Sequence, residues 1–171
     1  PTAGTVNKPV NQITSYSTLM TGKFRYFIKP DTSSYYSFAW IDVSREPVIF
    51  EIPEAGKLYA GFARFDSWGD VYKRYDPSSE HKMNKFAVTV RLWNGTLPEG
   101  VEEVTAPTSL VLWVHKIRPS SAAGFANYVK AYQQKINLVP LSRYGNAYTQ
   151  PKKRYDDSLP SKPPLEQGYD L

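Results

Sequence analysis

The densest group of polar and charged side chains follows an apolar run, in the stretch Arg-Phe-Asp-Ser-Trp-Gly-Asp-Val-Tyr. Asp66 and Asp70 are two carboxylates four positions apart, with Trp68 between them. A glycosidase uses one carboxyl group as acid and a second as base or nucleophile, and aromatic rings stack on sugar faces. We therefore expect Asp66 and Asp70 to be catalytic, and Arg64, Trp68 and Tyr72 to bind substrate. In the structural alternative, Asp66 caps a turn and Trp68 belongs to the core.

A second polar group enters the most aromatic segment of the chain and contains Lys29, Asp31, Ser33 and Tyr36. The Tyr36 hydroxyl is a candidate catalytic proton donor or base in an elimination reaction. Lys29 can pair with Asp66 or with the carboxylate of a uronate, and Asp31 is assigned to the same substrate-binding group. The structural alternative is an Asx turn at Asp31.

The sequence has two histidines and no cysteine. His115 ends an apolar run and is a candidate catalytic base near neutral pH, or else a strand-end residue with a satisfied hydrogen bond. His81 lies in a polar loop and is expected to be exposed. These counts exclude thiol-based zinc and redox sites and argue against a multi-histidine metal centre. We expect no cofactor, and an oxygen-ligand metal such as calcium is left open.

The composition is that of one globular domain, with 171 residues, 41% hydrophobic and 22% charged. No apolar run reaches the roughly 20 residues that a membrane span needs. The net charge of +5 suits an acidic partner such as an acidic polysaccharide, although the basic residues can also be a solubilising surface. Nucleic acid and membrane are not expected as partners, because the lysines and arginines are scattered and no recognition helix or stacking motif is present.

Eight segments have the β-branched and aromatic composition of strands and are bounded by turn-forming residues. Within residues 35–43, both alternating faces are largely apolar: Ala39 and Ile41 lie on one, and Phe38 and Trp40 on the other. Such a strand is typical of a sandwich core. We predict a mainly β fold, an antiparallel, jelly-roll-like β-sandwich, with strands at residues 24–29, 35–43, 48–52, 58–65, 71–75, 86–92, 101–105 and 110–114.

One C-terminal amphipathic helix is predicted at about residues 121–136, because Phe125, Val129, Tyr132 and Ile136 recur at helical spacing. Residues 11–142 are expected to form the folded domain. An irregular segment at 1–10 precedes it, and an extended, proline-rich tail at 143–171 follows it. The chain begins with Pro1 and not with methionine, so we expect a processed piece of a larger protein.

The order of several runs between residues 10 and 142 resembles the domain-of-unknown-function 1254 family. The runs are Phe27-Ile28-Lys29-Pro30, Ile41-Asp42-Val43-Ser44-Arg45-Glu46-Pro47-Val48, Phe65-Asp66-Ser67-Trp68, Leu97-Pro98-Glu99-Gly100-Val101, Ala106-Pro107-Thr108 and Leu138-Val139-Pro140-Leu141-Ser142. Family members usually carry an Asn-Asn-Asp-Thr-like run where this chain has Asp31-Thr32-Ser33-Ser34, and an arginine at Lys29. An asparagine is common at Ser109. If those positions form the family's polar site, its chemistry is altered here or the site has moved.

A divergent branch of this family resembles the C-terminal domain of a virion protein of chlorella viruses, which are large algal DNA viruses. That protein is associated with degradation of the host cell wall. The resemblance implies a fragment of a larger virion polypeptide that acts outside the cell on the host wall.

Two functions are therefore expected from the sequence. The first is degradation of acidic or neutral cell-wall polysaccharide, by hydrolysis with Asp66 and Asp70 or by elimination with Tyr36, His115 and Lys29. The second is a non-catalytic carbohydrate-binding or structural virion module. Carboxylate geometry separates them, because the two carboxyl groups of a glycosidase lie roughly 5 to 10 Å apart around one pocket.

Overall fold

The computed structural model describes residues 10–20, 31–56, 58–75, 84–119, 125–149 and 154–155. The predicted strand at residues 24–29, with Lys29, lies outside the described residues, as does His81.

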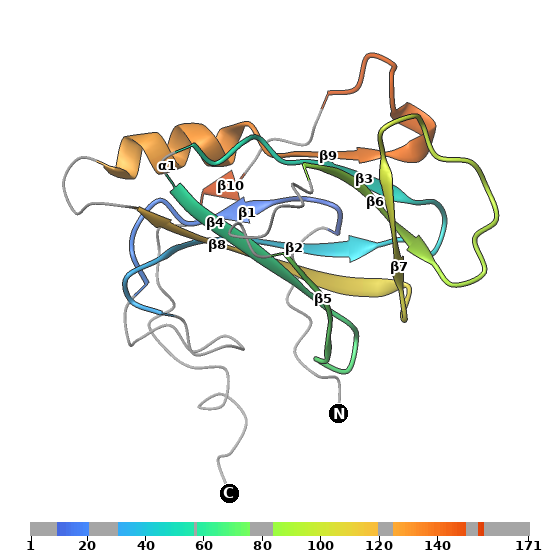
Figure 1. Ribbon diagram of the computed structural model, residues 1–171, viewed down its shortest axis with the longest axis horizontal. Coiled ribbons are helices and arrows are strands. Elements are labelled where there is room, and N and C mark those ends of the chain that lie inside the picture. Colours follow the sequence, from blue (N-terminus) through green and yellow to red (C-terminus); the bar gives the residue numbers. More distant parts are fainter. Residues whose placement is uncertain are drawn as a thin grey trace, which may run out of the picture.

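The described chain forms two stacked sheets (Figure 1). The larger sheet has the strand order β10-β1-β2-β8-β4-β5, and the smaller sheet has the order β7-β6-β3-β9. The larger sheet contains β1 (Thr14–Ser15), β2 (Tyr35–Asp42), β4 (Leu58–Phe65), β5 (Val71–Tyr75), β8 (Leu110–Pro119) and β10 (Arg154–Tyr155). The smaller sheet contains β3 (Val48–Glu51), β6 (Lys85–Val90), β7 (Glu102–Ala106) and β9 (Asn137–Pro140). The predicted mainly β, sandwich-like fold is confirmed.

Most neighbouring strands pair antiparallel, as predicted, but two pairs are parallel. These pairs are β1 with β10 and β6 with β7. A long connection at residues 91–101 carries the chain from the end of β6 back to the start of β7, which a parallel neighbour requires. The sheets are therefore mixed at these edges.

The space between the sheets is filled by aromatic rings from both of them. Phe50 and Phe86 of the smaller sheet stack with ring centroids 4.7 Å apart, and Trp113 of β8 packs 5.3 Å from Phe50. Phe62 of β4 stacks 5.4 Å from Phe86. Because side chains alternate along a strand, the other face of the larger sheet holds a second apolar cluster that includes Tyr16, Tyr36 and Leu112. The predicted double-sided burial of residues 35–43 is thus seen in β2.

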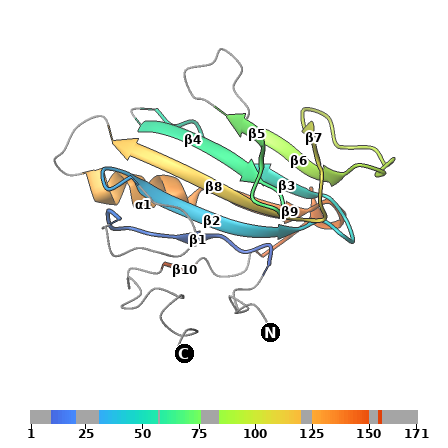
Figure 2. The same cartoon turned by 90° about the horizontal axis from the view of Figure 1, so that it is seen from below.

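The helix α1 (Phe125–Gln134) lies on the same side of the larger sheet as the smaller sheet and covers one end (Figures 1 and 2). Val129, Tyr132 and Ile136 join the core from the helix and the turn after it, as their spacing predicted. The chain then enters β9 and a short 3-10 turn, η1 (Leu141–Arg143). Residues 121–124 of the predicted helix lie outside the described residues. No helix among the described residues is long and apolar enough to cross a membrane.

Candidate functional site

The turn between β4 and β5 is organised by the carboxylate of Asp66. Its Oδ1 accepts hydrogen bonds from the backbone N–H of Trp68 at 3.0 Å and of Asp70 at 2.9 Å. Two backbone bonds close the same turn: the Asp66 N–H donates to the Asp70 carbonyl, and the Gly69 N–H donates to the Asp66 carbonyl. Gly69 has φ +92°, which residues with a side chain rarely adopt. The turn-capping alternative for Asp66 is therefore what the structure contains.

A neighbouring turn holds this one from the side. The Ser67 N–H donates to Thr108 Oγ1 at 3.1 Å, and the Ser67 hydroxyl donates to the Leu110 carbonyl at 2.8 Å. The Thr108 hydroxyl donates to the same carbonyl. The two turns are therefore fixed to each other at one end of β8.

Trp68 lies outside the core, with 78% of its surface exposed. It borders a pocket of about 290 Å³ on the outward face of the larger sheet. We call this group the Trp68 surface; it consists of Trp40, Phe65, Asp66, Ser67, Trp68, Gly69 and Leu112. Trp40, Phe65 and Leu112 come from three adjacent strands, β2, β4 and β8, and the turn adds Trp68 and two polar side chains. Asp70 is exposed in the same turn.

Replacing Asp66 with alanine is expected to lower the free energy of unfolding by about 1–3 kcal/mol, because two backbone donors lose their acceptor. Asp70→Ala is the matched control: its carboxylate is exposed, so its expected effect is within about 0.5 kcal/mol. Urea denaturation of both variants measures the difference. Equal effects of the two substitutions would contradict the capping role of Asp66.

Arg64 was predicted to bind substrate, but it points into the core. Its guanidinium lies 4.0 Å from the ring centroid of Phe86 and 4.9 Å from that of Phe62. Burial lowers the pKa of Arg64 to about 10, and Tyr72 and Glu102 act in the opposite direction. Arg64 therefore cannot contact a ligand on the Trp68 surface.

Tyr72 was also predicted to bind substrate. It packs against the core cluster, and burial raises the pKa of its hydroxyl to about 12. The pocket that it lines is a different one, near Arg91 and Thr105 at the edge of β7. The structure therefore places Tyr72 away from the Trp68 surface.

His115 is fully buried, midway along β8 and not at its end. Its ring packs against Phe62, Trp113 and Tyr132, with centroid distances of 5.8, 5.1 and 5.7 Å. Neither ring nitrogen has a hydrogen-bond partner among the described residues, and burial lowers the pKa of His115 to about 3. A general base must come within hydrogen-bond reach of its substrate. The core position of His115 argues against the predicted catalytic role.

The second polar group forms around Asp31. Its Oδ1 accepts bonds from the Ser33 N–H and hydroxyl at 2.8 and 2.7 Å, which is the Asx turn of the structural alternative. Lys116 Nζ and Arg118 Nη2 lie 2.9 and 2.6 Å from Asp31 Oδ2. Lys116 and the Ser33 bonds hold the pKa of Asp31 well below its usual range. The Asp31 N–H donates to the Tyr36 hydroxyl at 3.0 Å, so Asp31, Ser33 and Tyr36 do lie together.

The two predicted groups lie at opposite ends of the outward face of the larger sheet. Tyr36 pairs in register with Lys116, and Trp40 with Leu112. Tyr36 and Trp40 are four positions apart along β2, which is about 13 Å. Tyr36 is largely buried, with 6% of its surface exposed. The two turns expected as structural alternatives, at Asp66 and at Asp31, are thus present and lie apart. Lys116 and Arg118 were not predicted as partners of Asp31. Their alternation along residues 110–118 places them on the same face of the strand.

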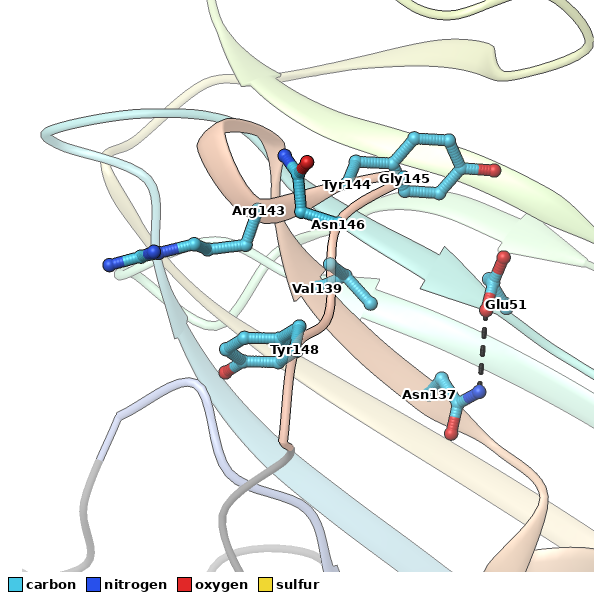
Figure 3. A pocket seen from close by; sticks show the side chains of 8 residues that line it. All are labelled: Glu51, Asn137, Val139, Arg143, Tyr144, Gly145, Asn146 and Tyr148. Atoms are coloured by element: carbon cyan, nitrogen blue, oxygen red, sulfur yellow. Dashed lines mark hydrogen bonds between the residues drawn. The ribbon is translucent and has the colours of Figure 1, made fainter.

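A larger pocket, of about 440 Å³, was not predicted from the sequence (Figure 3). It lies over β3 and β9 of the smaller sheet and is walled by residues 143–148, which were predicted to be tail. The only signal was the composition of that segment, Arg-Tyr-Gly-Asn-Ala-Tyr. Among the residues that the structure describes, no cluster of three or more carboxylate or histidine side chains is placed to hold a metal ion.

Residues 10–140 match the model of a family described as "Protein of unknown function (DUF1254)". The chain belongs to the DUF1254 family. No curated protein matches this DUF1254 domain. The crystal structure of the VPA0106 protein from Vibrio parahaemolyticus is similar, with a TM-score of 0.65 and 22% sequence identity. The match covers 91% of this chain and 36% of that one, so the DUF1254 domain spans about a third of that protein. At this identity the likeness shows the fold alone.

Two of the runs that carry the DUF1254 resemblance meet in space. The Phe65-Asp66-Ser67-Trp68 run lies against the Ala106-Pro107-Thr108 run through the hydrogen bond from the Ser67 N–H to Thr108. In this DUF1254 domain, the first run lines the Trp68 surface and the second lies beside it.

Proposed function

We propose that this domain binds polysaccharide through the Trp68 surface. One observation carries the proposal: an indole with 78% of its surface exposed stands beside a second tryptophan over a pocket of about 290 Å³. Apolar side chains that are partly or largely exposed and grouped on one surface, as Trp40, Phe65 and Trp68 are here, are typical of interaction sites. Aromatic rings of this kind stack on the apolar faces of sugars.

The rigidity of the turn supports the same proposal. Asp66 Oδ1 fixes the Trp68 backbone, and Ser67 ties the turn to the start of β8. A turn whose backbone is already fixed loses little conformational entropy when a ligand binds. The carboxylate of Asp70 is exposed in the same turn and can accept hydrogen bonds from sugar hydroxyls.

The partner that we propose is the cell-wall polysaccharide predicted from the sequence. The net charge of +5 favours an acidic cell-wall polysaccharide over a neutral one, through long-range attraction. The resemblance to the chlorella-virus virion protein supports a place on a virion, within a larger polypeptide, and contact with the host algal wall. That step rests on the sequence resemblance alone.

Hydrolysis is the second candidate, and the position of Asp66 favours it. Asp66 lines the pocket together with Trp40 and Trp68, and Asp70 lies in the same turn. The turn therefore carries both carboxylates that a glycosidase needs, and one of them, Asp66, lines the pocket with the aromatic rings. Binding is preferred over hydrolysis because Oδ1 of Asp66 is already occupied by two backbone donors. Elimination is disfavoured, because its proposed base His115 is buried in the core.

The test is sedimentation of the purified domain with insoluble algal walls and with neutral and acidic polysaccharides. Soluble sugar and the ultraviolet absorbance of unsaturated products are followed in the same tubes. We expect retention on at least one polysaccharide and release of neither product. Failure to bind any of them would overturn the proposal.

Asp66→Asn separates binding from hydrolysis. The asparagine oxygen can still accept both backbone bonds, so the turn and its binding are expected to persist. If the native domain releases sugar and the Asp66→Asn variant does not, hydrolysis with Asp66 as a catalytic group is supported. Release that continues in both Asp66→Asn and Asp70→Asn would remove these carboxylates from the mechanism.

A further inference from the structure

The 440 Å³ pocket over the smaller sheet has a polar floor (Figure 3). Glu51 of β3 and Asn137 of β9 are direct partners in the strand register, and Asn137 Nδ2 donates to Glu51 Oε2 at 3.3 Å. Val139 adds an apolar patch two residues along β9. Figure 3 shows the Tyr148 ring across Val139 from the Glu51–Asn137 pair, and the Arg143 side chain directed away from that pair.

The chain that leads into the wall of the pocket is tied to the turn before β3. The Leu141 N–H donates to the Pro47 carbonyl at 2.9 Å. The Ser142 N–H and hydroxyl donate to the two carboxylate oxygens of Glu46 at 2.7 and 3.1 Å. Gly145 has φ +77°, which lets the chain turn back over the sheet. These contacts fix the position of the wall over the smaller sheet.

The charge of the floor limits which ligand fits. Lys85 Nζ lies 3.7 Å from Glu51 Oε1, so the carboxylate already has a cationic partner and does not call for a cationic ligand. An anionic group bonded at the floor would lie beside the Glu51 carboxylate, while Lys85 is already paired with that carboxylate and the Arg143 side chain is directed away from it. An apolar ligand would cover the Glu51–Asn137 pair and remove its remaining contact with water, which is costly. A neutral ligand with many hydroxyls avoids all three penalties.

We propose that this pocket binds one neutral sugar unit, with the Tyr148 ring against the sugar and the Glu51–Asn137 pair bonded to its hydroxyls. Its volume lies within the range of roughly 300–1,000 Å³ that is usual for ligand sites. A carboxylate and a side-chain amide together offer acceptors and a donor, which matches hydroxyl groups that do both. The proposal shares only the ligand class with the Trp68 surface, because the two sites lie on different sheets.

The experiment is a titration of the full chain with methyl glucoside, methyl N-acetylglucosaminide and glucuronate, followed by backbone amide shifts in ¹H–¹⁵N spectra. We expect a neutral glycoside to shift the amides of residues 137–148, and glucuronate to bind at least about tenfold more weakly. Tyr148→Ala is expected to weaken binding about tenfold. The matched control is Tyr128→Ala, which removes a half-exposed ring on α1 and is expected to change nothing.

Asn137→Gln tests the floor without removing its amide. The longer side chain displaces the donor, so we expect weaker binding with an unchanged fold. Trp68→Ala is expected to leave the shifts at residues 137–148 intact, so failure at one site is distinguishable from failure at the other. Absence of shifts at residues 137–148 with every sugar, or tighter binding of glucuronate, would overturn the proposal.

Discussion

Acidification from pH 6.5 to pH 4.5 is expected to lower the free energy of unfolding by about 2 kcal/mol through His115 alone. The ring is fully buried among three aromatic side chains, and burial lowers its pKa to about 3. In the unfolded chain the same ring has a pKa of about 6.5. Between these values the unfolded chain binds a proton that the folded chain does not bind. The stability that depends on neutral His115 is therefore complete above about pH 6.5 and falls as the pH drops toward 3.

His115→Phe tests this directly, because phenylalanine keeps a ring of similar shape in the aromatic cluster and cannot be protonated. We expect urea denaturation at pH 6.5, 5.5 and 4.5 to give a slope for the native protein that is steeper by about 1 kcal/mol per pH unit than for the variant. Equal slopes would show that His115 has the same pKa in the folded and unfolded chains, and therefore that its ring is not held in an apolar core.

The control for the acidic groups is Asp31→Asn. Lys116 and Ser33 hold the pKa of Asp31 below its usual range, so the contribution of Asp31 is present above its unfolded pKa near 3.8 and is lost below it. Removing the carboxylate is therefore expected to change stability without changing the slope between pH 6.5 and pH 4.5. If the slope of the free energy of unfolding against pH disappears in Asp31→Asn, the acid sensitivity arises from Asp31 at the surface and not from His115 in the core.

Trp68→Ala is expected to weaken polysaccharide binding by about 10- to 100-fold, which corresponds to roughly 1.4 to 2.8 kcal/mol. The indole contributes the most exposed aromatic area of the proposed surface. Because most of the ring already contacts water, its removal is expected to change the free energy of unfolding by no more than about 0.5 kcal/mol. Affinity electrophoresis in gels that contain the bound polysaccharide measures the first effect, and urea denaturation the second.

Leu92→Ala is the matched control for Trp68→Ala, since Leu92 is 91% exposed in the loop after β6. If both substitutions weaken retention equally, binding is non-specific adhesion of apolar side chains. Loss with Trp68→Ala alone supports a defined surface.

The β-sandwich could be predicted because apolar residues on both alternating faces of a single segment already indicate a strand that is covered on both sides. In β2, residues 35–42 carry apolar side chains on both faces, and both are packed. The positions at which the strands end could not be predicted as well from the alternation of apolar residues. β8 was predicted to end at Val114, since His115 and Lys116 interrupt the apolar run. It continues to Pro119 because β2 and β4 pair along both sides of it.

The candidate site was predicted in part. The turn at Asp66 could be predicted from local chemistry, because aspartate caps such turns. The exposure of Trp68 could not, because a tryptophan occurs both in cores and on surfaces and its residue type does not distinguish them. The inward position of Arg64 had a signal: Leu58, Ala60 and Phe62 alternate ahead of it, and the next inward position is Arg64. Its charge hid that pattern. The pocket at Tyr148 depends on β9 pairing with β3, about 90 residues earlier in the chain, which local sequence does not contain.

The central claim, that sugars bind at the Trp68 surface, is tested most directly by the four indole N–H signals of the chain in ¹H–¹⁵N spectra. The signals are assigned with single tryptophan-to-phenylalanine variants and followed during titration with a soluble oligosaccharide of the retained polysaccharide. We expect the indole signals of Trp68 and Trp40 to shift with one affinity, while that of buried Trp113 stays in place. Binding that leaves the Trp68 and Trp40 signals unmoved would contradict the account.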